Sequence, residues 1–103
     1  MKKFMVLGVG NAQVDLINYL KNKFEIHSCS YVNKGRGLAN VDYFSLIDIT
    51  NKEKVLEYCE KNKIDYIYSI GSDVAMPTIA WVSEKMGLKT FVSYKIANAC
   101  NTK

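Results

Sequence analysis

The chain has 103 residues, of which 49% are hydrophobic and 23% charged, and its formal net charge is +4. This composition predicts one folded domain, because the charged fraction is close to the globular average. The lysines are scattered and no basic stripe alternates with aromatic residues, which argues against nucleic-acid binding. No apolar run approaches the ~20 residues of a membrane span. Three cysteines without a zinc spacing fit reduced thiols in a cytoplasmic protein.

Short apolar segments alternate with segments of helical periodicity along the chain. Strands are predicted over 4–9, 25–32, 43–47, 64–70 and 90–93. Helices are predicted over 12–24, 50–63 and 77–86. A loop with two glycines is predicted over 33–39. Such alternation favours an α/β fold, a Rossmann-like three-layer sandwich of about five mostly parallel strands with helices on both faces.

Local signals mark where the later helices begin and end. Thr50 and Glu53 form a capping-box pattern, in which the threonine hydroxyl accepts from a free amide and the glutamate reaches back. Pro77 fits the first turn of the third helix, where its missing N–H costs little. Gly87 is expected to end that helix in a left-handed conformation, with Leu88 packed against it.

Two turns carry the residue types expected of a ligand site. The segment 8–13 reads Gly-Val-Gly-Asn-Ala-Gln between a strand and a helix, and Ser72 and Asp73 follow the fourth strand directly. Open parallel sheets bind ligands at the carboxyl ends of their strands, where these turns are predicted to lie. The amides at a helix start favour an anion there.

The glycine turn is an incomplete dinucleotide fingerprint. Gln13 stands where the third glycine is expected, and 30–33 contains no carboxylate to hold a ribose. A nicotinamide cofactor is therefore disfavoured. Three alternatives stay open: another ligand at this edge, a turn with no ligand, and a nucleotide-sensing module.

The order of short motifs resembles the amino-terminal domain of ATP-grasp ligases, in the branch described as carbamoyl-phosphate-synthase-large-subunit-like. The resemblance rests on the turn with its following apolar pair, an Asp-Ile-Thr step, a Lys-Ile-Asp entry, a Ser-Asp-x-Ala-x-Pro-Thr segment and a Glu-Lys-x-Gly-Leu segment. These lie at 8–17, 48–50, 63–65, 72–78 and 84–88. The chain departs from the family at 31–33 and 39–40, where acidic residues are usual, so substrate preference is not transferred.

The resemblance implies a division of labour between this domain and later lobes. Residues 1–94 would be the pre-ATP-grasp domain and 95–103 the start of a connection to an ATP-grasp domain. ATP and Mg²⁺ would be held mainly by lobes outside this chain, with Lys103 as a nucleotide contact. The chain would then be a non-catalytic fragment of a ligase that joins a small carboxylate to an amine or a similar nucleophile.

Six residues are expected to line one wall of the substrate site, which the resemblance places in this domain. They are Gly8, Gly10, Asn11, Gln13, Ser72 and Asp73. For Ser72 and Asp73 a role as helix N-cap is the competing interpretation. His27, the only histidine, is assigned a structural role. A protein-interaction domain, which could form a homodimer through an exposed apolar face, is a further alternative.

Overall fold

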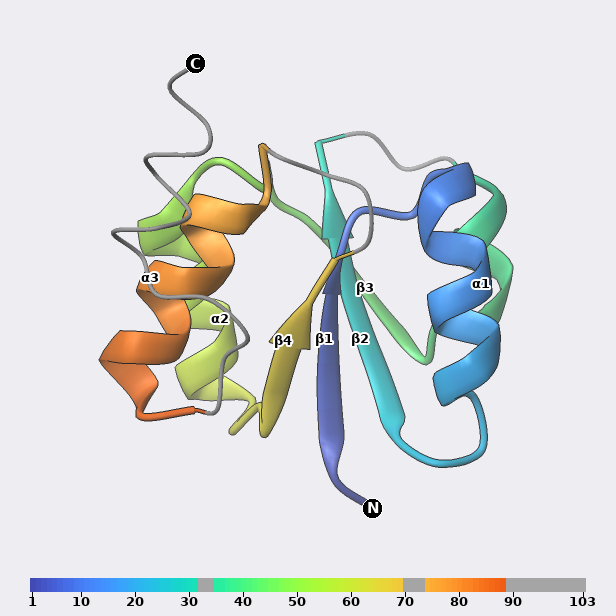
Figure 1. Cartoon of the computed structure of the whole chain (residues 1–103), viewed down its shortest axis with the longest axis horizontal. Helices are drawn as coiled ribbons and strands as arrows, with labels where there is room; N and C mark the ends of the chain where they lie inside the picture. Colours follow the sequence, from blue (N-terminus) through green and yellow to red (C-terminus); the bar gives the residue numbers. More distant parts are fainter. Residues whose placement is uncertain (32–34, 70–73, 89–103) are drawn as a thin grey trace.

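The computed structural model describes residues 1–31, 35–69 and 74–88. Within these ranges the chain alternates strands and helices, as Figure 1 shows. The elements are β1 (Lys3–Leu7), α1 (Asn11–Leu20), β2 (Glu25–Ser30), the 3₁₀ helix η1 (Arg36–Asn40), β3 (Tyr43–Leu46), α2 (Lys52–Lys61), β4 (Tyr66–Tyr68) and α3 (Met76–Met86). The predicted α/β class is confirmed.

The four described strands form one parallel sheet in the order β3-β2-β1-β4. Helix α1 covers one face, while α2 and α3 lie side by side on the other (Figure 1). The sheet is therefore the middle of three layers, as predicted. The predicted fifth strand over 90–93 lies outside the described residues.

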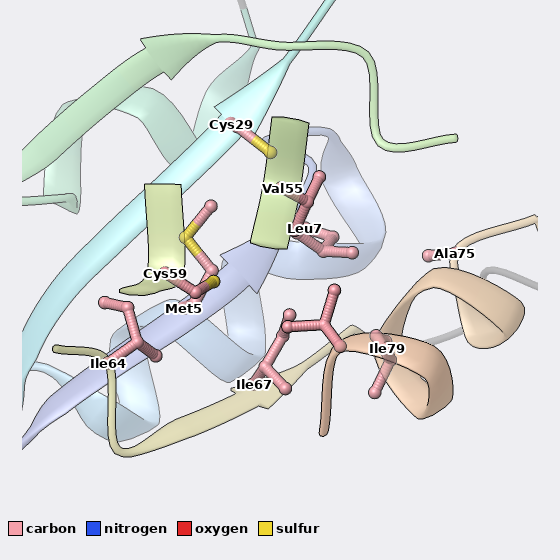
Figure 2. Close-up of a cluster of buried hydrophobic side chains, with 10 residues drawn as sticks. Met5, Leu7, Cys29, Val55, Cys59, Ile64, Ile67, Ala75 and Ile79 are labelled. Carbon is pink, nitrogen blue, oxygen red and sulfur yellow. The ribbon is translucent and has the colours of Figure 1, made fainter. Parts of the chain in front are cut away.

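The central strand β1 explains why the sequence begins with a continuous apolar run. Its side chains alternate between the two faces, so Val6 packs with Ile17 beneath α1. Met5 and Leu7 belong to the larger cluster under α2 and α3, shown in Figure 2. A strand buried on both faces is expected to be mainly apolar.

Helix α1 ends at Leu20, four residues before the predicted end at residue 24. Asn22 adopts a left-handed conformation with φ 75°, which turns the chain back toward the sheet. Phe24 is nevertheless buried in part, because it packs edge-on against the rings of Phe4 and Tyr66. The apolar spacing predicted a longer helix, but Phe24 reaches the core from the turn that follows α1.

The predicted capping box at Thr50 is wrong. The Thr50 hydroxyl donates to the Asp48 carboxylate at 2.7 Å, and the N-cap of α2 is Asn51, whose side chain accepts from the Lys54 N–H at 3.3 Å. The Asp48 carboxylate, two residues earlier in the chain, accepts from the Thr50 hydroxyl, and Asn51 caps the helix instead. Its bonds from the backbone N–H and hydroxyl of Thr50 hold the pKa of Asp48 below the ordinary value.

The signals at the ends of α3 are confirmed. Pro77 occupies its first turn, and Gly87 ends it with φ 70°. The Leu88 N–H then donates to the Ser83 carbonyl at 2.8 Å, and its side chain packs against the core. The predicted loop over 33–39 is corrected in part, since its described second half belongs to η1.

The two described cysteines and Tyr58 make stability sensitive to alkali. Burial raises the pKa of Cys29 and of Cys59 from 9.0 to about 12, and raises that of Tyr58 from 10.0 to about 12. The unfolded chain therefore loses these protons first. The stability that they contribute is complete below pH 9 and is lost as the pH rises toward 12.

We expect the urea concentration at the unfolding midpoint to decrease as the pH is raised from 9 to 11. The decrease should be less steep in the Cys29→Ala/Cys59→Ala variant. The measurement is urea unfolding followed by circular dichroism at a series of pH values. Because alanine also leaves small cavities, the slopes against pH are compared and the absolute stabilities are not. Equal slopes for the two proteins would contradict the prediction.

Candidate functional site

The glycine turn lies at the carboxyl end of β1, between β1 and α1, as predicted. Gly8 has φ 100°, a conformation that favours glycine, and its N–H donates to the Cys29 carbonyl at 2.8 Å. The buried Ser28 hydroxyl lies 2.8 Å from the Val6 carbonyl and 2.9 Å from the Gly8 carbonyl. Strand β2 thus holds the turn in place from the side.

Helix α1 begins at this turn without a side-chain cap. Its N-cap is Gly10, which is exposed and has no side-chain capping bond, and the first turn carries no acidic residue. A helix start of this kind carries a partial positive charge and favours an anionic group. A Cβ added at Gly10 would meet no atom within 4 Å. A ligand can therefore approach the backbone here.

Gln13 does not extend away from this turn. Its side chain is 4% exposed, and a Cβ added at Gly8 would lie 3.6 Å from its Cγ. It packs over Gly8 and so supports the turn from within. Whether its amide reaches a substrate stays a prediction.

A second loop closes against the same turn. Gly35 has φ 151°, and a Cβ added there would lie 2.5 Å from the Val9 carbonyl oxygen and 2.8 Å from Val9 Cγ2. The backbone at Gly35 therefore touches the backbone at Val9. The conformation of the glycine turn depends on residues from β1, β2 and this loop together.

The structure places part of the predicted site. Gly8, Gly10 and the start of α1 at Asn11 are adjacent, whereas Ser72, Asp73 and Lys103 lie outside the described residues. The N-cap of α3 is Ala75, with no side-chain capping bond. The competing helix-cap interpretation of Ser72 and Asp73 therefore concerns residues outside the described ranges.

The described part of this edge carries apolar side chains that sequence reasoning missed. Tyr31, directly after β2, is 73% exposed, and Val74, just before α3, is 52% exposed. Tyr31 stands where a dinucleotide site would have its ribose-binding acid. Its position after a strand end was visible in the sequence, but its exposure was not.

Hollows also lie away from the glycine turn. One of about 280 Å³ opens at the opposite end of α1, between Lys21, Phe24, Asn40 and their neighbours. Parallel sheets bind ligands at their carboxyl edge, so the strand ends are a better candidate site than this hollow. Among the described residues, no three His, Cys, Asp or Glu side chains gather in a way that could hold a metal. None of the described helices has the length and apolarity to cross a membrane.

His27 lies in a polar cluster that the sequence did not reveal. The side chain is buried, with Nε2 2.7 Å from Glu25 Oε2 and Nδ1 2.6 Å from the Tyr58 hydroxyl. Its ring stacks on Tyr43 with centroids 4.8 Å apart. The predicted structural role fits this cluster, in which each ring nitrogen has a partner.

Two fully buried serines give opposite expectations for stability. Ser28→Ala removes the hydroxyl that holds the Val6 and Gly8 carbonyls, so we expect a loss of about 1–2 kcal/mol. Ser83 has no hydrogen-bond partner for its hydroxyl among the described residues, so Ser83→Ala is expected to leave stability unchanged or raise it by up to about 1 kcal/mol. Thermal unfolding of both variants checks the pair. A similar loss in both would refute the assignment.

Comparison with known proteins places the fold. The sequence matches no family model and no curated protein. The structure superposes on phosphoribosylglycinamide synthetase from Anaerococcus prevotii with a TM-score of 0.82 and 22% identity over 96% of this chain. The glycinamide-RNase-transformylase T of Mycobacterium tuberculosis gives 0.76 and 11% over 94%.

The chain shares its fold with these two enzymes. It spans only 25% of the first enzyme's length and 28% of the second's. Identities this low establish the fold and leave the activity to be argued from the site.

Proposed function

We propose that this chain is the amino-terminal, substrate-binding domain of a cytoplasmic ATP-dependent ligase of the ATP-grasp type. The observation that carries the proposal is the glycine turn with its uncapped helix start, placed at the ligand-binding edge of a fold shared with a synthetase. The motif resemblance, which extends over most of the chain, points to the same class. The carbamoyl-phosphate-synthase-like branch is the finer part of the proposal.

In this proposal the domain binds and orients a small carboxylate or amine substrate. The uncapped start of α1 binds the anionic group, and the two glycines let it approach the backbone. Asn11, Ser72 and Asp73 supply polar contacts, of which Asp73 suits an ammonium group. Positioning of this kind contributes to the rate by fixing the reacting atoms in line.

The reaction of the whole ligase would proceed in two transfers. A substrate carboxylate oxygen attacks the γ-phosphorus of ATP, and ADP leaves, so that an acyl phosphate forms. An amine then attacks the carbonyl carbon, and inorganic phosphate leaves. ATP and Mg²⁺ are held by lobes beyond these residues, with Lys103 as a contact, and the domain alone is not catalytic.

The names of both structural relatives contain glycinamide, which supports a small amino compound or carboxylate as the substrate class. A dinucleotide is less well supported. Gln13 packs over Gly8, and the described residue that follows β2 is the exposed Tyr31. A change in NADH fluorescence on addition of the protein would favour the dinucleotide instead.

The first test is the size of the native protein in its source cell, measured with an antibody to this domain. A product several-fold larger than 103 residues is expected. That larger protein should release ADP from MgATP only when a suitable carboxylate and nucleophile are present. A native product of 103 residues would overturn the ligase proposal.

A further inference from the structure

A groove runs between α2 and β3, away from the glycine turn. It has a volume of about 220 Å³ and is lined by α2, by β3 and by the residue that directly follows β3. They are Ser45, Ile47, Lys54, Glu57, Tyr58 and Lys61. Strand β3 is the outermost described strand on this side of the sheet. The groove therefore lies beside an edge to which a further strand could be added.

The backbone of β3 presents hydrogen-bonding groups at this edge. In a parallel sheet a strand uses alternate residues for each neighbour. The bond from the Gly8 N–H to the Cys29 carbonyl assigns the odd residues of β2 to β1, which leaves its even residues for β3. With Ser28 in register with Phe44, the N–H and C=O groups of Phe44 and Leu46 point away from β2.

Apolar side chains accompany this edge. Tyr43 is 53% exposed and Leu46 is 65% exposed, on opposite faces of β3. An added strand would cover part of both side chains, since its own side chains would project on both faces of the sheet. Exposed edges of this kind bind extended peptides through main-chain hydrogen bonds, and neighbouring pockets select the side chains.

The groove is held in shape by the histidine cluster. Tyr58 lines it, and the Tyr58 hydroxyl is 2.6 Å from His27 Nδ1. His27 in turn lies against Glu25 and stacks on Tyr43. Tyr43 and Tyr58 are thus fixed by one buried residue. A surface that is already formed loses less entropy when it binds a partner.

The charges along the groove favour an acidic partner. Lys54 and Lys61 line it with one acid, Glu57, and within the described part of the chain no ion pair joins either lysine to a carboxylate. Seven helical residues separate the lysines by about 10.5 Å along the axis. Side chains of a strand that point to one face repeat every ~6.6 Å. Two acids on one face of an added strand can therefore reach both lysines.

The geometry points to a docking site for an extended acidic segment of a partner protein, which adds to the sheet beside β3 and places its acidic side chains against Lys54 and Lys61. The chain's own residues 89–103 do not suit it, because they contain three lysines and no acid. A second copy does not suit it either, because each copy carries a net charge of +4.

The test uses a seven-residue peptide in which glutamate alternates with valine, and its counterpart with glutamine in place of glutamate. Binding to the full 103-residue chain is measured by titration calorimetry. We expect the glutamate peptide to bind about tenfold more tightly than the glutamine peptide. The double variant Lys54→Glu/Lys61→Glu should lose that preference. The matched control Lys2→Glu/Lys23→Glu, with the same change in net charge, should keep it.

Strand addition is tested separately from charge. Leu46→Pro removes one outward N–H, so it should weaken binding about tenfold relative to Leu46→Ala. Amide exchange of Phe44 and Leu46 in the unaltered chain should slow when the peptide is added, a measurement that needs no variant. The proposal is overturned if these amides gain no protection, or if the control pair of lysine variants loses as much affinity as the groove pair.

Discussion

Gly35→Ala should lower the free energy of unfolding by about 3 kcal/mol, because two costs coincide at this residue. The methyl group would lie 2.5 Å from the Val9 carbonyl oxygen and 2.8 Å from Val9 Cγ2, closer than real Cβ contacts. The backbone also has φ 151° and ψ 152°, a region occupied almost only by glycine. The loop would have to move off the glycine turn. Chemical denaturation of the purified variant measures the loss.

Gly10→Ala is the matched control for this effect. Gly10 lies next to Val9 in the same turn, but it has φ −76° and an added Cβ would contact nothing. We expect its stability to stay within about 0.5 kcal/mol of the unaltered chain. If Gly35→Ala were equally mild, the contact between the loop and Val9 would not hold the turn. If the two variants were equally damaging, the turn itself would be the sensitive element.

His27→Leu should cost about 2–3 kcal/mol, the second largest expected loss. Leucine fills a similar space, but it leaves the Tyr58 hydroxyl and one Glu25 oxygen without their hydrogen bond to His27. The bond to Tyr58 connects β2 with α2 across 31 residues of sequence. The variant should therefore loosen α2 on the sheet, which hydrogen exchange of the α2 amides would show as faster exchange.

A double-mutant cycle separates the hydrogen bond from general packing. Tyr58→Phe alone should cost about 1 kcal/mol, and the double variant with His27→Leu should cost less than the sum of the single losses. Tyr43→Phe serves as control. It keeps the ring that stacks on His27 and removes only the hydroxyl of an exposed residue. Strictly additive losses for His27 and Tyr58 would show that the 2.6 Å contact contributes no energy of its own.

Features set by neighbouring residues were predictable, whereas those set by distant ones were not. Pro77 and Gly87 mark the ends of α3 through local backbone geometry, so the sequence alone located them. The apolar run at β1 reflects burial on both faces and was equally clear. The cap of α2 is an exception among these local features, because Asp48, two residues before Thr50, competes for its hydroxyl.

In the candidate site, too, local features were predictable and tertiary contacts were not. Gly8 and Gly10 could be placed at a strand end because their spacing is itself the signal. The contact of Gly35 with Val9 and the partners of His27 depend on tertiary approach, which no spacing encodes. Asp73, Ser72 and Lys103 stay predictions, since they lie outside the described residues.

The central position of β1 has a consequence for how the chain reaches its fold. Strand β1 is the first element, yet one of its neighbours is β4, and the Lys3 N–H bonds the Asp65 carboxylate 62 residues later. Pairing over such a separation is slow. A nascent or clipped chain that ends before Tyr66 would leave the central strand β1 with an open edge, which is a site for aggregation. Successful folding of this protein therefore depends on how quickly β4 becomes available to β1.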